Sequence, residues 1–186
     1  MWLYFLITYA VLVITYDAPF LIERYHFSES FSGWLIALFF LAIMLPGLFL
    51  GRIIRALRSS TNLVSLLLMA FGLGLFGYAH KEWMMLLAAL AAGFGYGIMQ
   101  PIIYDKTATI APPRSATLAL SFVMAMNYLA VMICPFILSM LHTLFHTHGE
   151  HFGFRFNAVL VLIMLLVALF DRKGFVLGLD ERYFVE

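Results

Sequence analysis

Residues 33–58 read GWLIALFFLAIMLPGLFLGRIIRALR, in which nineteen residues without a charge are followed by a segment carrying three arginines. A bilayer core of about 30 Å is crossed by about 20 apolar residues in an α-helix, whereas a membrane β-strand needs only about 10. The length of this apolar run therefore predicts a membrane-spanning helix that ends in a basic hinge.

The same alternation of long apolar runs and short hinges continues along all 186 residues. Hydrophobic residues make up 64% of the chain and charged residues 11%, compared with about 25% charged residues in a soluble domain. The sequence therefore predicts an all-α membrane protein that forms a single domain over residues 1–186 with six transmembrane helices. The expected helices cover residues 2–22, 33–51, 62–79, 83–104, 115–141 and 154–170.

The first expected helix lacks both the basic leading segment and the small-residue cleavage site of a signal peptide, so we expect it to remain as a span.

Lysine and arginine favour one side of the predicted membrane. Eight lie on the side of both termini: Arg52, Arg55, Arg58, Lys106, Arg114, Arg172, Lys173 and Arg182. Three lie on the other side: Arg24, Lys81 and Arg155. Because cytoplasmic hinges carry the excess of basic residues, both termini are expected in the cytoplasm, in a bacterial inner (plasma) membrane.

Three stretches carry a family pattern. Residues 47–58 join a glycine-rich helix end to a basic hinge, residues 93–101 read GFGYGIMQP and precede a proline-containing hinge at 111–116, and residues 19–34 form an amphipathic exit from the first helix. Together they resemble the major facilitator superfamily, whose complete members have twelve helices in two six-helix halves. The resemblance covers the full chain and implies half of such a fold.

The half that the chain resembles is the C-terminal one. N-terminal halves usually carry an Asp in the basic hinge and an Arg-x-x-Gln-Gly run in the fourth helix, and this chain has neither between Gly51 and Arg58 or in its fourth expected helix. The Gly-Pro-Gly pattern of many antiporters is also missing, since Pro135 stands without its glycines. The resemblance therefore implies a second six-helix half on another polypeptide or in a homodimer partner, or else a truncated gene.

The function that the resemblance implies is secondary transport of a small organic solute by alternating access. The sequence contains no nucleophile elbow, Walker loop or cysteine pair, so we expect neither an enzyme nor a cofactor, and the net charge of +1 gives no reason to expect nucleic acid. The 19 Phe, 9 Tyr and 11 Met favour efflux of amphipathic compounds. Two alternatives are a non-transporting remnant or assembly subunit, and a metal-handling membrane protein.

Three polar residues within apolar runs are candidates for contact with substrate or coupling ion: Asp17, Gln100 and Asn127. Asp17 either senses a proton or cation in a cavity or, if Pro19 breaks the helix, caps its second piece. Gln100 either binds solute or satisfies carbonyls freed by Pro101. Asn127 either binds solute or hydrogen-bonds a neighbouring helix.

Two glycine pairs are candidate conformational hinges. Gly47 and Gly51, and likewise Gly93 and Gly97, are four residues apart, so that each pair removes side chains from one helix face and lets another backbone approach. Such faces suit either helix sliding or static packing. Pro101, Arg52 and Arg55 join the hinge candidates, and the arginines either latch to a second half or lie among anionic headgroups.

Histidines gather near the end of the fifth expected helix, where His142, His146, His148 and His151 accompany Glu150. Only His142 and His146 have a spacing that a helix would fix, and a transition-metal site needs at least one further oriented ligand. We therefore expect a polar interfacial segment here and no metal site.

Overall fold

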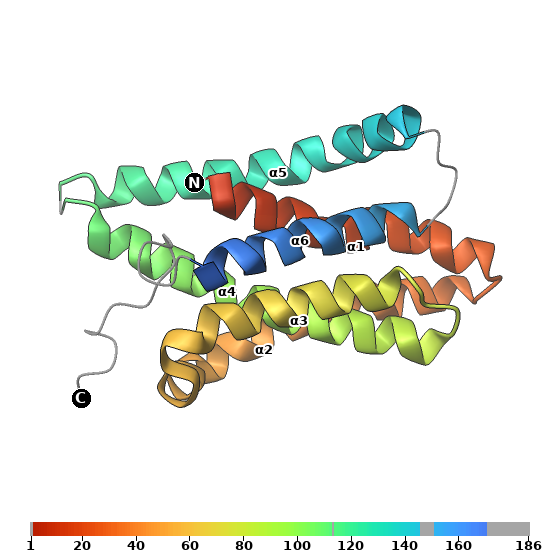
Figure 1. The fold of residues 1–186 in the computed structure, drawn as a ribbon, viewed down its shortest axis with the longest axis horizontal. Coiled ribbons are helices and arrows are strands. Elements are labelled where there is room, and N and C mark those ends of the chain that lie inside the picture. Colours follow the sequence, from red (N-terminus) through yellow and green to blue (C-terminus); the bar gives the residue numbers. More distant parts are fainter. Residues whose placement is uncertain (1, 113, 146–150, 171–186) are drawn as a thin grey trace.

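The computed structural model describes residues 2–112, 114–145 and 151–170. These residues form helices and no strand, which confirms the all-α prediction for the described part of the chain. The elements are α1 (Trp2–Arg24), α2 (Glu29–Leu57), the 3-10 turn η1 (Arg58–Ser60), α3 (Thr61–Phe76), α4 (Glu82–Ile110), α5 (Ala116–Leu144) and α6 (Phe152–Phe170). Figure 1 shows the helices lying along one common long axis, with successive helices running in opposite directions.

Five helical runs in the described residues are long and apolar enough to cross a membrane. They are Tyr4–Arg24, Ser30–Phe76, Glu82–Ile110, Ala116–Leu144 and Phe152–Phe170. The second run contains α2, η1 and α3. Counted as one span, it gives five candidate spans, whereas the sequence predicts six because it treats the two helices as separate spans.

Several helices extend beyond their predicted limits. α2 continues from Gly51 to Leu57 because Ile54 is still buried there, against Ile98 and Ile102 of α4. The expected end at Gly51 was therefore wrong, since helix geometry continues past the last fully apolar turn. α4 likewise continues from Tyr104 to Ile110, whereas α3 ends three residues before the expected Ala79.

α1 is continuous through Pro19, so the alternative in which Asp17 caps a second helical piece is wrong. A proline within a membrane helix loses one backbone hydrogen bond, but neighbouring helices can hold the segment in place. Here Ala18 and Leu21, on either side of Pro19, are fully buried. The packing of α1 against its neighbours thus overrides the local preference of the residue that precedes a proline.

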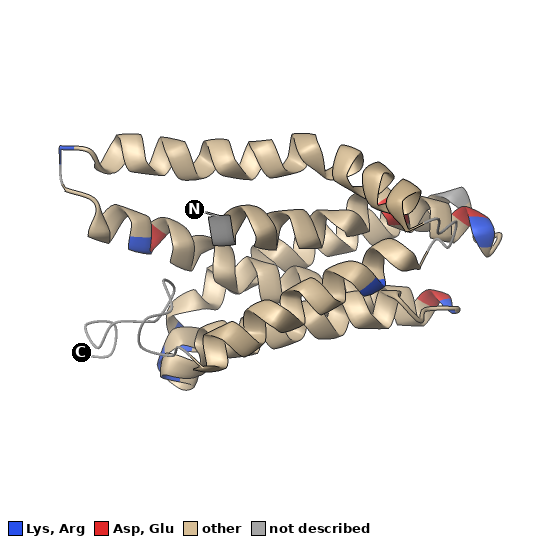
Figure 2. Cartoon of the chain, turned by 45° about the horizontal axis from the view of Figure 1, so that its top comes forward, with Lys and Arg blue, Asp and Glu red and all other residues tan. Residues whose placement is uncertain are grey.

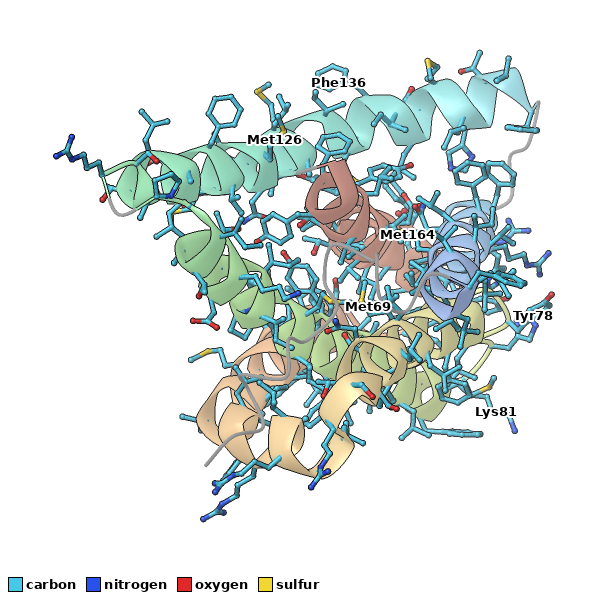
Figure 3. The ribbon with its side chains drawn as sticks, turned by 60° about the vertical axis from the view of Figure 1, so that its left-hand side comes forward. Met69, Tyr78, Lys81, Met126, Phe136 and Met164 are labelled. Atoms are coloured by element: carbon cyan, nitrogen blue, oxygen red, sulfur yellow. The ribbon has the colours of Figure 1, made fainter. Side chains whose placement is uncertain are left out.

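α4 packs closely against two helices at its glycines. A Cβ atom on Gly93 would meet the Phe39 carbonyl oxygen at 2.7 Å, and one on Gly97 would overlap the backbone of Ile43, so α2 passes directly over this glycine pair. On another face, Gly95 lies against the Ser65 carbonyl and Met69 of α3. Figure 3 shows Met69 within the bundle. These contacts confirm the close helix approach that the Gly93–Gly97 pair predicts.

The Gly47–Gly51 pair behaves differently. Both glycines are exposed on α2, and a Cβ atom added to either would meet no other described atom within 4 Å. The close approach expected here is therefore not made within the described part of this chain.

Figure 2 shows the charged residues of the described chain toward the two ends of the bundle, with an uncharged middle between them. We call one end the basic end, where the described residues include Arg52, Arg55, Arg58, Lys106 and Arg114. We call the other the histidine end, where they include His26, His80, His142 and His151 together with Arg24, Lys81 and Arg155. The described basic residues thus divide five to three, on the sides that the hinges predict.

Candidate functional site

Two cavities have walls from both α1 and α5, whose contact we call the α1–α5 seam, and α2 and α4 also line the first of them. The first is about 270 Å³ in volume, and its polar lining consists of Thr8, Tyr96, Gln100 and Asn127. None of its described lining residues is charged, so we call it the uncharged cavity. The second, about 810 Å³, lies toward the histidine end and contains Asp17, so we call it the Asp17 cavity.

Hydrogen bonds join three helices around the uncharged cavity. The Tyr96 hydroxyl of α4 donates to Asn127 Oδ1 of α5 at 3.3 Å, and the Thr8 hydroxyl of α1 lies 3.0 Å from the Tyr96 oxygen. Because the Tyr96 hydroxyl has a single proton, Thr8 is the donor of the second bond. Asn127 therefore hydrogen-bonds a neighbouring helix, which is one of the two roles predicted for it, and it also lines a cavity.

Gln100 lines the same cavity, but its side chain reaches along α4. Its Nε2 donates to the Tyr104 hydroxyl at 3.4 Å, and Tyr104 in turn lies 2.9 Å, oxygen to oxygen, from Tyr4 of α1. Tyr104 thus belongs to an interhelical polar network. Pro101 lies inside α4, which continues through it.

Asp17 does not join Gln100 and Asn127. It lies nine residues beyond Thr8 on α1, which is about 14 Å along the helix axis. Between the two cavities the Tyr16 hydroxyl donates to the Val131 carbonyl oxygen at 3.1 Å. Since Tyr16 lines the Asp17 cavity and Val131 the uncharged one, this bond crosses the seam where the two cavities meet.

The Asp17 carboxylate is 9% exposed, and its Oδ2 is buried without a hydrogen-bond partner among the described residues. This oxygen lies against Gly153 at the start of α6, where an added Cβ would overlap it. Sequence reasoning missed Gly153, because nothing in the order of residues brings position 153 next to position 17.

A second polar group missed from the sequence lies at the histidine end. The Tyr25 hydroxyl is within hydrogen-bonding distance of His80 Nδ1 and lies 3.0 Å from His151 Nε2. His151 Nδ1 lies 3.1 Å from the Phe76 carbonyl oxygen, and Arg155 Nε donates to the Gly77 carbonyl oxygen at 2.8 Å. α6 thus caps the C-terminus of α3, whose last carbonyls lack partners within their own helix.

The predicted histidine group is divided by the structure. His142 lines the Asp17 cavity, whereas His151 belongs to the group around Tyr25. His146, His148 and Glu150 lie outside the described residues. Within the described ranges no three histidine, cysteine or acidic side chains are placed to hold a metal ion.

The arginine hinge candidates lie on the exposed last turns of α2. Arg55 Nε donates to the Gly51 carbonyl oxygen at 3.2 Å, and the Arg52 guanidinium lies 5.9 Å from the centre of the Phe49 ring. Because α2 continues past Gly51, Arg52 and Arg55 share a rough helix face, whereas Arg58 follows the helix with a φ of 48°. That positive φ marks the sharp change of direction between α2 and α3.

Comparison with known families gives one result. The family model described as the Major Facilitator Superfamily matches residues 1–179. A search of curated proteins finds no match.

Proposed function

Because this chain belongs to the major facilitator superfamily, we propose that it is one six-helix half of a secondary transporter that moves a small organic solute by alternating access. Members of this superfamily are transporters rather than enzymes, and the apolar helices make the chain an integral multi-pass membrane protein. The alternative of a non-transporting remnant or assembly subunit is tested by the flux measurements below.

The observation that carries this proposal is the α1–α5 seam. Polar groups inside a bilayer are costly and mark solute or ion paths by default. Here Asp17, Gln100 and Asn127, from α1, α4 and α5, line two cavities that border the seam, with the Tyr16–Val131 bond between the cavities. We propose that the seam faces the solute path and that these three residues contact solute or coupling ion.

Six crossings follow if the run Ser30–Phe76 folds back on itself within the membrane. One straight helix of 47 residues would be about 70 Å long, more than twice the thickness of a bilayer core. η1 separates α2 from α3, and the two helices run in opposite directions in Figure 1. We therefore propose that α2 and α3 are separate spans, with the basic end in the cytoplasm of a bacterial cell.

The orientation predicts which positions a membrane-impermeant maleimide reaches in intact cells. Cys134 is the sole cysteine of the sequence and is buried, so background labelling is low. Lys81→Cys, at the histidine end, is expected to label from outside, whereas Ser59→Cys, at the basic end, is expected to label only after the cells are opened. Labelling of Ser59→Cys alone from outside would reverse the proposed orientation.

A second half is proposed as the partner, either another six-helix polypeptide or a second copy of this chain. α2 and α5 leave large apolar side chains exposed, among them Met44 and Leu48 of α2 and Phe136 of α5, which projects outward in Figure 3. Lipid covers part of this surface in any membrane protein. The exposed Gly47–Gly51 face of α2, which has open space in this chain, suits a closely packed partner helix.

We propose that the transporter moves its solute out of the cell. Export of amphipathic compounds suits walls rich in aromatic and methionine side chains, which adapt to varied apolar shapes. The walls of the uncharged cavity include Phe39 and Phe40, and those of the Asp17 cavity include Phe20.

The transport role of the seam is tested by Asn127→Leu in membrane vesicles from cells that make the chain with its partners. The readout is gradient-driven flux of a panel of labelled neutral, anionic and cationic organic solutes. Asn127 is half-buried, but its loss leaves the buried Tyr96 hydroxyl without its acceptor, which costs about 1–3 kcal/mol. Each 1.36 kcal/mol added to the transport barrier is a factor of ten in rate, so flux is expected to fall about tenfold or more.

Tyr128→Phe is the matched control, because Tyr128 is the next residue on α5 and is 68% exposed. Its flux is expected to equal that of the unmodified chain. Equal flux in Asn127→Leu and Tyr128→Phe would remove the uncharged cavity from the solute path.

A further inference from the structure

We propose that the Asp17 cavity is a binding site for amphipathic organic cations, with the Asp17 carboxylate as their counter-ion. The site belongs to the seam proposed for transport and so rests on that function for its biological role. Binding itself needs no transport, however, and is measured separately below.

The first observation is the state of the carboxylate. Asp17 is more than nine-tenths buried and lines the cavity, and its Oδ2 has no hydrogen-bond partner among the described residues. Burying an ionised group without a partner is strongly unfavourable, and buried polar atoms in proteins nearly always have a partner. Oδ2 lies against α6 and makes no hydrogen bond, so the charge of the buried carboxylate is only partly compensated. A cationic group that enters the adjoining cavity would complete that compensation from the other side of the carboxylate.

The second observation is how the carboxylate is held. Gly153 leaves no room for a Cβ where α6 passes Asp17. The carboxylate is thus backed by α6 backbone on one side, and the cavity lies between α1 and α5. A fixed charge loses little conformational freedom on binding, which favours affinity.

The third observation is the size and lining of the cavity. Its volume of about 810 Å³ lies within the range of about 300–1,000 Å³ typical of sites for drug-sized ligands. Tyr16 and Phe20 supply aromatic rings one helical turn apart on α1, and Pro135 and Leu138 of α5 add apolar wall. Aromatic faces attract cations and also bury apolar groups, so the lining suits a ligand that is both charged and apolar.

The fourth observation is the balance of charge. Besides Asp17, the lining holds the Glu23 carboxylate and the Arg24 guanidinium, together with His26 and His142. The lining thus holds two carboxylates and one guanidinium. This excess of carboxylates favours cationic ligands over anionic ligands of the same shape.

The test uses the purified full chain in detergent and two probes of nearly equal size and shape but opposite charge, tetraphenylphosphonium and tetraphenylborate. Equilibrium binding is measured against protein-free micelles. We expect saturable binding of the phosphonium at about one per chain and no saturable binding of the borate. Equal binding of both probes, or no saturable binding of the phosphonium, would overturn the proposal without any variant being made.

Two substitutions then locate the site. Asp17→Asn keeps the shape and removes the charge, and loss of one member of a buried charge pair is expected to weaken phosphonium binding roughly 30-fold or more. Glu23→Gln, on the exposed rim of the cavity, is expected to weaken phosphonium binding a few-fold. Its control is Glu82→Gln, because Glu82 is an exposed acid at the same end but outside the cavity, and this variant is expected to bind the phosphonium unchanged. Unaltered binding in Asp17→Asn would overturn the proposal, whatever Glu23→Gln does.

The outcome separates two failures. Phosphonium binding that depends on Asp17 in a chain that gives no flux with any partner would keep the cation site and reject transport. Flux that depends on Asn127 but excludes cations would keep transport and reject the cation site.

Discussion

Among the described glycines at which an added Cβ would meet backbone atoms, Gly97→Ala is expected to cause the largest loss of stability. The new Cβ would overlap the backbone of Ile43, and a backbone atom cannot move aside as the end of a flexible side chain can. Overpacking typically costs about 1–3 kcal/mol and occasionally more. Because α2 would have to shift as a whole away from α4, we expect a cost at the upper end of that range.

The measurement is the fraction of monodisperse protein that survives heating in detergent, followed by size exclusion. Gly51→Ala is the matched control, because it also adds a methyl group to a membrane helix but meets no described atom within 4 Å. It is expected to behave like the unmodified chain. Similar survival of Gly97→Ala and Gly51→Ala would show that α2 does not pack on α4 as described.

The same control has a second use. If the exposed Gly47–Gly51 face packs against a second half, Gly51→Ala should leave the isolated chain unchanged but weaken the assembled transporter. A variant that is neutral in the monomer and harmful in the assembly would therefore locate the partner on α2.

The sequence predicts the helical architecture well because apolar length is a local property. A run such as residues 33–51 can hardly be anything but a membrane helix, and the alternation of short hinges sets the up-and-down order. The close packing at Gly93 and Gly97 is also predictable from the sequence, since two glycines on one helix face allow a neighbouring backbone to approach. α2 provides that neighbour at Phe39 and Ile43.

What could not be predicted depends on contacts between residues far apart in the chain. The helix break that was one alternative at Pro19 does not occur, because burial of Ala18 and Leu21 outweighs the local preference of the residue before a proline. The contact of Asp17 with Gly153, 136 positions further along the chain, exists only once α6 packs on α1. Asp17 itself could be picked out from the sequence as a buried charge, but its cavity could not.

The group around Tyr25 illustrates the same limit. Its members come from the turn after α1, the loop after α3 and the start of α6, and each is an ordinary polar residue in its own segment. His151 was predicted to share an environment with His142, its neighbour in sequence. The fold instead turns His151 toward α3 and His142 toward the Asp17 cavity.

The proposal that this chain is one half of a transporter predicts an all-or-none dependence of flux on assembly. A solute path between two halves needs walls from both, and alternating access needs one half to rock against the other. The isolated six-helix chain should therefore give no more flux than protein-free liposomes, whatever solute of the panel is used.

The decisive measurement compares flux in liposomes that hold the purified chain at a verified monomeric state with flux in liposomes that hold the same amount of chain as a dimer or with a six-helix partner half. We predict background flux for the monomer and gradient-driven flux for the assembly, lost again in Asn127→Leu. Gradient-driven flux by the verified monomer would contradict the half-transporter account.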